Sequence, residues 1–149
     1  MAVPVHLTDT NILLRLSQPQ DPNYHVIRAA VHSLRAADAG LCFTTQNLAE
    51  FWNVCTRPQA QNGYGLNVAE TDPRAALIEA SFTLLPDSEK VHAEWRRLVV
   101  SHAVMGVQVH DARIVAAMRV HGVTHLLTLD ELDFLRYPVI HPRQIPKSS

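Results

Sequence analysis

The sequence lacks several features that would assign it to a common class. It has no run near the ~20 apolar residues that cross a bilayer. Residues 1–11 carry neither a basic start nor an apolar core, so we expect no signal peptide. Cys42 and Cys55 are the only cysteines, too few for the disulfide framework of a small secreted domain. We therefore expect a cytoplasmic protein with reduced, buried thiols and no membrane contact.

Motifs for zinc, nucleotides and serine hydrolysis are missing too. The chain has nine histidines, but no His-x-x-x-His pair falls inside an expected helix, because Gly122 separates His121 from His125. There is no Cys-x-x-Cys pair, glycine-rich phosphate loop or Gly-x-Ser-x-Gly elbow. These absences exclude the usual zinc, P-loop and α/β-hydrolase sites.

The charge balance excludes a strongly basic nucleic-acid binder, since the net charge is −1. The basic residues are nevertheless biased, with eleven Arg against two Lys. Arginine is the better bidentate partner for phosphate, so the bias is compatible with phosphate contacts. It is equally compatible with an arginine-rich genome.

The chain of 149 residues is close to the commonest size of one domain. We expect a single domain over residues 1–142 and a flexible tail over 143–149. Short apolar strands are expected at residues 3–7, 41–43, 83–86, 125–128 and 137–140. Helices are expected from about residue 9 to 16 and at 24–37, 45–56, 73–82, 88–103 and 111–121. Gly40 is expected to cap the second helix, a loop is expected at 59–67, and residues 104–109 fit either a strand or a loop.

Strands that alternate with amphipathic helices predict an α/β sandwich with a mainly parallel sheet of four to five short strands. Ligand sites in such sheets gather beyond the carboxyl ends of the strands. Asp9 and Asp130 each follow an expected strand, so both belong at that edge. Aspartate is also a favoured N-cap, and capping alone would account for either residue.

Asp111 and Glu50 lie in expected helices. Asp111 shares the face of the apolar stripe Ile114, Val115 and Met118, so its carboxylate projects towards the core side of a helix start. Glu50 points away from the apolar face of its helix, which makes it a surface residue unless that side borders a cleft. Carboxylates brought together repel one another unless a cation neutralises them, and hard divalent cations prefer oxygen ligands. The pattern therefore favours a hydrated divalent metal.

Four ordered motifs resemble those of PIN domains. They are DTN at residues 9–11, LAEF at 48–51, HDARIVAA at 110–117 and LTLDELDF at 127–134. Together they span nearly the whole chain. The resemblance implies a three-layer, Rossmann-like fold with strand order 3-2-1-4-5, and it favours a loop over residues 104–109.

The resemblance also implies a function. It suggests an endoribonuclease dependent on Mg²⁺ or Mn²⁺, of the VapC-like toxin type, with an RNA substrate, a small antitoxin partner and a homodimeric assembly. The implied site residues, several of them metal ligands, are Asp9, Asn11, Glu50, Asp111, Thr128, Asp130 and Asp133.

Each implied residue has an expected role. Asp9, Glu50, Asp111 and Asp130 would hold the metal, and Asp133 would replace or supplement Asp130. Asn11 would orient Asp9, and Thr128 would support the site by hydrogen bonding.

Three other protein classes were compared with the sequence. A haloacid-dehalogenase-like phosphatase also starts with a strand and an aspartate, but Asn11 stands where the second aspartate would be, and neither Lys90 nor Lys147 fits the required lysine. A response-regulator receiver fails because the same lysine is missing. The main alternative is a non-catalytic PIN-like scaffold that dimerises and binds a partner protein or RNA.

Overall fold

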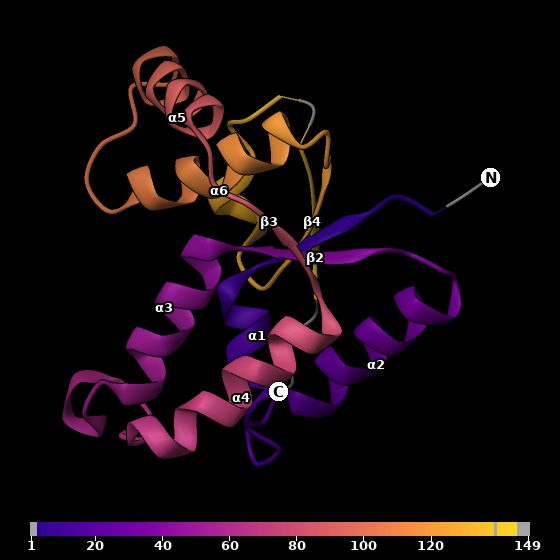
Figure 1. Cartoon of the computed structure of the whole chain (residues 1–149). Coiled ribbons are helices and arrows are strands. Elements are labelled where there is room, and N and C mark those ends of the chain that lie inside the picture. Colours follow the sequence, from indigo (N-terminus) through magenta and orange to yellow (C-terminus); the bar gives the residue numbers. More distant parts are fainter. Residues whose placement is uncertain (1–2, 139, 146–149) are drawn as a thin grey trace.

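The computed structural model describes residues 3–138 and 140–145. Its centre is a five-stranded sheet in the order β3-β2-β1-β4-β5, and every neighbouring pair is parallel (Figure 1). This is the predicted α/β fold and strand order. The strands are β1 (His6–Thr8), β2 (Leu41–Thr44), β3 (Thr83–Leu85), β4 (His125–Thr128) and β5 (His141–Gln144).

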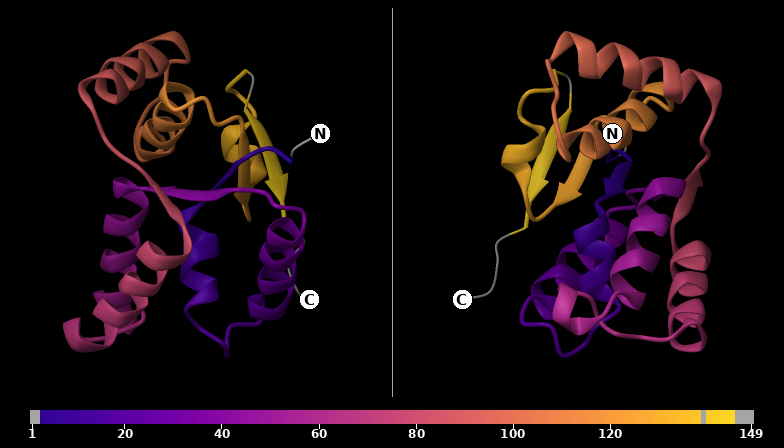
Figure 2. Two further views of the ribbon diagram at one scale, coloured as in Figure 1. Left: turned by 45° about the vertical axis from the view of Figure 1, so that its right-hand side comes forward. Right: turned by 90° about the vertical axis from the view of Figure 1, so that its left-hand side faces the viewer.

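Helices cover both faces of this sheet. They are α1 (Thr10–Leu16), α2 (Tyr24–Ala36), α3 (Thr45–Thr56), α4 (Val68–Ser81), α5 (Glu89–Ser101) and α6 (Gln108–Val120). Short 3₁₀ turns, η1 (Gln59–Gln61) and η2 (Glu131–Phe134), follow α3 and β4. The views in Figure 2 separate α5 and α6 from the helices α1 to α4. None of the helices within the described ranges is long and apolar enough to span a membrane.

Side-chain alternation along the strands explains these layers. Leu7 and Leu126 pack with the apolar residues of α5 and α6. Leu41 and Leu127 face the other way and pack against α1 and α2. Phe43 joins a third cluster with residues of α1, α3 and α4. Burial of β1, β2 and β4 on both faces accounts for their largely apolar character, whereas the edge strands β3 and β5 are partly exposed.

Several local predictions are wrong. The fourth helix begins at Val68 rather than at residue 73, because Asn67 and Glu70 form a capping box at its start. Gly40 does not cap α2. The cap is Ala37, and Asp38 takes the left-handed conformation with φ of 60°.

The last strand is also displaced from its predicted position. It lies at His141–Gln144 rather than at residues 137–140, and it pairs with β4 from His125 to Thr128. Arg143 and Gln144, which we expected in the tail, belong to this edge strand. Residues 146–149 of the expected tail lie outside the described part of the chain. At the other end, β1 begins at His6 instead of residue 3.

Residues 104–107 connect α5 to α6 as a loop. The resemblance favoured a loop over a strand here. Helix α6 begins at Gln108, one turn earlier than predicted, and its N-cap is Val107. Asp111 therefore lies inside the first turn of the helix and does not cap it.

Candidate metal centre

Five acidic side chains line one hollow of about 270 Å³ at the carboxyl edge of the sheet. They come from the β1–α1 junction, α3, α6 and the segment after β4: Asp9, Glu50, Asp111, Asp130 and Asp133. The remaining lining is Thr10, Asn11, Leu14, Asn53, Val54 and Phe134. No Lys, Arg or His side chain is part of this lining. The fold thus brings together the acids that the sequence places far apart.

Asp9 is both a helix cap and a member of this hollow. Its Oδ1 accepts a hydrogen bond of 2.8 Å from Thr10 N, and its Oδ2 accepts one of 2.8 Å from Thr128 Oγ1. The pKa of Asp9 is raised to about 6, chiefly by burial and in addition by the charges of Glu50 and Asp130. These two hydrogen bonds act against the rise. The capping and site interpretations are therefore compatible, and Thr128 supports Asp9 as expected.

Glu50 faces the hollow rather than bulk solvent. Thr10 Oγ1 donates to Glu50 Oε2 over 3.0 Å, and Gln46 Nε2 donates to Glu50 Oε1 over 2.6 Å. Asn47 Nδ2 in turn donates to Thr10 Oγ1 over 2.9 Å. A relay from Asn47 through Thr10 thus fixes Glu50 relative to Asp9. The surface interpretation from the helical pattern is wrong, because the polar side of α3 borders the cleft.

Asp111 has the least compensated charge in the site. The pKa of Asp111 is raised to about 7, chiefly by burial and in addition by four carboxylates, namely those of Asp9, Asp133, Glu50 and Asp130. Among the described residues, no hydrogen bond or ion pair joins the Asp111 side chain to a neighbour. The carboxyl group of Asp111 therefore keeps its proton below a pH of about 7, and above it the ionised group would be stabilised by a cation.

Asp130 and Asn11 form a pair across the mouth of the hollow. Asn11 Nδ2 donates to Asp130 Oδ2 over 2.7 Å, and Asp130 N donates to Thr128 Oγ1 over 2.9 Å. Asn11 was expected to orient Asp9, but its side chain holds Asp130 instead. Asp133 lines the hollow from the exposed turn η2.

The chemistry of this donor set fits a hard divalent cation. The available donors are carboxylate, amide and hydroxyl oxygens, which Mg²⁺ and Mn²⁺ prefer. Burial is the main cause of the raised pKa values of Asp9 and Asp111, and repulsion among the carboxylates adds to it. Over residues 3–138 and 140–145, no three acidic, histidine or cysteine side chains are already arranged as a complete metal site. Ion binding would therefore involve side-chain rotation and water ligands, as is usual for Mg²⁺.

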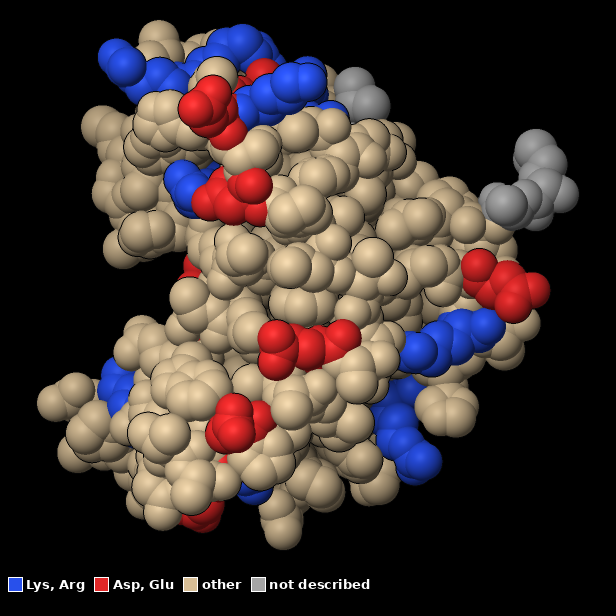
Figure 3. All heavy atoms as spheres, in the orientation of Figure 1, with Lys and Arg blue, Asp and Glu red and all other residues tan. Residues whose placement is uncertain are grey.

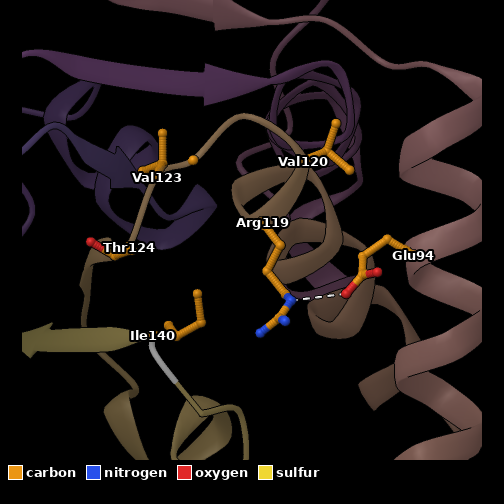
Figure 4. A pocket seen from close by; sticks show the side chains of 7 residues that line it. Glu94, Arg119, Val120, Val123, Thr124 and Ile140 are labelled. Atoms are coloured by element: carbon orange, nitrogen blue, oxygen red, sulfur yellow. Dashed lines mark hydrogen bonds and ion pairs between the residues drawn. The ribbon is translucent and has the colours of Figure 1, made fainter.

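Other hollows on the molecule have different chemistry. One of about 330 Å³ has a largely apolar lining that includes Val123 and Ile140 (Figure 4). At its edge Arg119 Nε donates to Glu94 Oε1 over 2.8 Å, so these two charges compensate each other. On the face shown in Figure 3, the blue basic atoms gather over α5 and near α2, each group with red acidic atoms beside it. The carboxyl-edge hollow remains the candidate centre.

Three residues that organise the centre escaped the sequence analysis as site residues. Thr10 was part of the first motif but had no role, although its hydroxyl and amide contact two of the acids. Gln46 stands four residues before Glu50 on the same helix, and that spacing brings side chains together. Asn47 was given no role, although its buried amide begins the relay.

Comparison with solved structures finds the same fold in toxin proteins. One match is VapBC-1 from nontypeable Haemophilus influenzae, with TM-score 0.70 and 15% identity over 94% of this chain and 97% of that one. Another is a toxin–antitoxin complex from Klebsiella pneumoniae, with TM-score 0.60 and 22% identity over 91% and 95%. A third is Mycobacterium tuberculosis VapC20, with TM-score 0.59 and 17% identity over 80% and 85%. At these identities the likeness concerns the fold.

Comparison of the sequence with curated proteins finds no match. Comparison with family models finds the PIN domain, which matches residues 7–139. That span contains the five acidic residues of the hollow, strands β2, β3 and β4 and all of β1 except His6, and it ends before β5. The chain therefore belongs to the PIN domain family.

Proposed function

We propose that this protein is a divalent-metal-dependent endoribonuclease and the toxin of a toxin–antitoxin pair. The observation that carries the proposal is the shared hollow of Asp9, Glu50, Asp111, Asp130 and Asp133, whose lining contains no basic side chain. PIN nucleases are generally dependent on divalent metals, and the donors at this site suit Mg²⁺ or Mn²⁺. A bound ion of this kind orients and activates water and stabilises charge on a phosphoryl group.

The residues of the chain have separate roles in this proposal. Asp9, Glu50, Asp111 and Asp130 would hold the ion, and Asp133 lies at the rim where it would supplement Asp130. Thr128 holds Asp9 in place, and Asn11 does the same for Asp130 through bonds already formed. These contacts reduce the rotational freedom that ion binding would otherwise remove.

The hollow suits a phosphodiester more readily than a large apolar ligand. Its volume of about 270 Å³ equals about nine water molecules at 30 Å³ each, enough for a hydrated ion and a phosphate group. RNA is favoured over DNA by the resemblance of the ordered motifs. It is also favoured by VapC20, which is described as a Sarcin-Ricin loop cleaving toxin.

Assembly partners form the second part of the proposal. The Klebsiella pneumoniae relative was solved as a toxin–antitoxin complex, which supports a small antitoxin partner here. A homodimer is supported by exposed apolar side chains around the α5–α6 connection, where Val100, Met105 and Val107 are 70%, 80% and 81% exposed. Light scattering after size-exclusion chromatography measures the assembly state. Induced expression, alone and with a small reading frame found directly upstream, tests toxicity and its relief.

The cleavage assay separates this proposal from a non-catalytic scaffold. Labelled RNAs are incubated with purified protein and Mn²⁺, or with chelator, beside an Asp111→Asn variant. An exposed aspartate outside the site supplies the matched control, Asp72→Asn. We expect Mn²⁺-dependent cutting by the parent and by Asp72→Asn only. A protein that binds RNA with no cutting and no response to Mn²⁺ would support the scaffold instead.

A further inference from the structure

Three histidines stand side by side at the opposite end of the sheet from the acids. His6, His125 and His141 begin β1, β4 and β5, and the strand register places them directly opposite one another. The ring centres of His6 and His125 are 5.1 Å apart, and those of His125 and His141 are 5.0 Å apart. His6 precedes Asp9 by three residues of extended chain, or about 10 Å. This histidine row is therefore separate from the carboxylate hollow.

Hydrogen bonds hold two of these rings, and on one of them they determine which nitrogen is free. His6 Nδ1 lies 2.8 Å from the carbonyl oxygen of Pro4, which only accepts, so Nδ1 carries the hydrogen. The lone pair of the neutral ring is then on Nε2. His125 Nδ1 lies 2.9 Å from Thr124 Oγ1, which can anchor that ring in the same way. Metal-ligating histidines are typically held like this, with the second nitrogen bonded to an oxygen of the protein.

We propose that His125 and His141 form a second metal site, which takes a borderline divalent ion such as Zn²⁺ or Cu²⁺ and has His6 beside it. Two imidazoles that share one ion at metal–nitrogen distances near 2.1 Å have ring centres about 5 Å apart, which is the spacing found here. His141 is exposed and His125 is half-buried, so an ion reaches them from solvent. No hydrogen bond within the described ranges occupies Nε2 of His125 or either ring nitrogen of His141.

The surroundings of the row favour neutral rings. Burial lowers the pKa of His6 and of His125, His125 lowers that of His6 further, and His141 lowers that of His125, while the hydrogen bond to Pro4 partly offsets the change at His6. Neutral imidazole is the form that binds metals. The cation that faces the row is Arg143, which stands two residues after His141 on β5 and also lowers the pKa of His6. No complete three-ligand site is preformed in the described residues, so water completes the coordination.

Donor chemistry separates the two sites. Imidazole suits zinc and copper, whereas carboxylate and water suit magnesium and manganese. The histidine row is thus expected to ignore Mg²⁺, and the carboxylate hollow is expected to supply no nitrogen ligand. This difference allows either proposal to fail without the other.

Titration of untagged, full-length protein tests the second site. Calorimetry with Zn²⁺ is run on the parent and on His125→Gln and His141→Gln. Each variant is expected to bind at least tenfold more weakly, since loss of even an outer-shell partner usually costs about 10–100-fold. His92→Gln, an exposed histidine of α5, is the matched control and should bind as the parent does. Equal Zn²⁺ affinity in the parent and in both row variants would overturn the proposal.

Electron paramagnetic resonance of bound Cu²⁺ supplies a second readout. A Cu²⁺ ion held by the histidine row should show splitting from its nitrogen ligands, and His125→Gln should remove this splitting. Asp9→Asn should keep this signal while losing its response to Mn²⁺. A Cu²⁺ spectrum without nitrogen splitting, or Zn²⁺ binding that disappears only in Asp9→Asn, would assign the ion to the carboxylates and contradict the histidine site. Loss of RNA cleavage with intact Zn²⁺ binding to the row would instead count against the proposed function alone.

Discussion

Replacing Asp9 by asparagine should stabilise the metal-free protein above neutral pH. The pKa of Asp9 is raised from 3.8 to about 6, chiefly by burial. A raised pKa of an acid means that the folded state holds the proton more tightly, so stability falls as pH rises from about 4 through 6. The shift of about two units corresponds to about 3 kcal/mol of unfolding free energy lost by pH 8.

Asparagine removes this cost but disturbs the hydrogen bonds from Thr10 N and Thr128 Oγ1. One impaired bond costs about 1 kcal/mol. The net gain is then about 2 kcal/mol at pH 8, or about 4–8 °C in Tm for a chain of this size. Near pH 4, where Asp9 is protonated, the gain should vanish.

The assay is thermal unfolding in chelator at several pH values, followed by circular dichroism. Asp72→Asn, at an exposed position of α4, controls for the loss of one negative charge from the molecule. The reasoning is refuted if Asp9→Asn lowers Tm at pH 8, or if its effect on Tm is the same at pH 4 and pH 8.

Three further outcomes follow from the same contacts. Mn²⁺ at 100 times its Kd should stabilise the parent by about 2.7 kcal/mol. In calorimetry, Glu50→Gln should weaken Mn²⁺ binding, and the exposed Glu79→Gln should leave it unchanged. An unaltered Kd in Glu50→Gln would remove Glu50 from the site. Thr128→Val removes a bond that lowers the pKa of Asp9, so carboxyl NMR should report an Asp9 pKa above about 6 and Mn²⁺ binding should need a higher pH. Gly63→Ala should lower Tm by the equivalent of about 1–3 kcal/mol, because its Cβ would lie 2.0 Å from the carbonyl oxygen of Arg57, and an unchanged Tm would contradict that tight turn.

The sequence predicts the site best where an acid follows a strand. Asp9 comes directly after β1 and Asp130 two residues after β4, and the carboxyl ends of parallel strands lie at one edge of the sheet. Asp111 was predicted from its place on the buried stripe of its helix, which also fixes its direction. The strand order came from the resemblance of the ordered motifs, since the spacing of short apolar runs does not say which strands pair.

The sequence fails where tertiary contacts decide the outcome. The helical pattern of α3 shows only which side faces its own core, so it could not tell that the side with Glu50 borders Thr10 and the hollow. The role of Asn11 was misassigned because Asp9 and Asp130 are neighbours only in the folded sheet. The last strand was placed too early, at 137–140, although proline is accepted in an edge strand and Pro142 lies within β5.

The most direct test of the carboxylate centre is a crystal soaked in Mn²⁺ and measured at the manganese absorption edge. Metal binding by the carboxylate hollow predicts an anomalous peak inside it, within coordination distance of oxygens from Asp9 and Asp111. The peak should be absent from crystals of Asp9→Asn. A protein crystal with no peak there at saturating Mn²⁺, or with the same peak retained in Asp9→Asn, would contradict it.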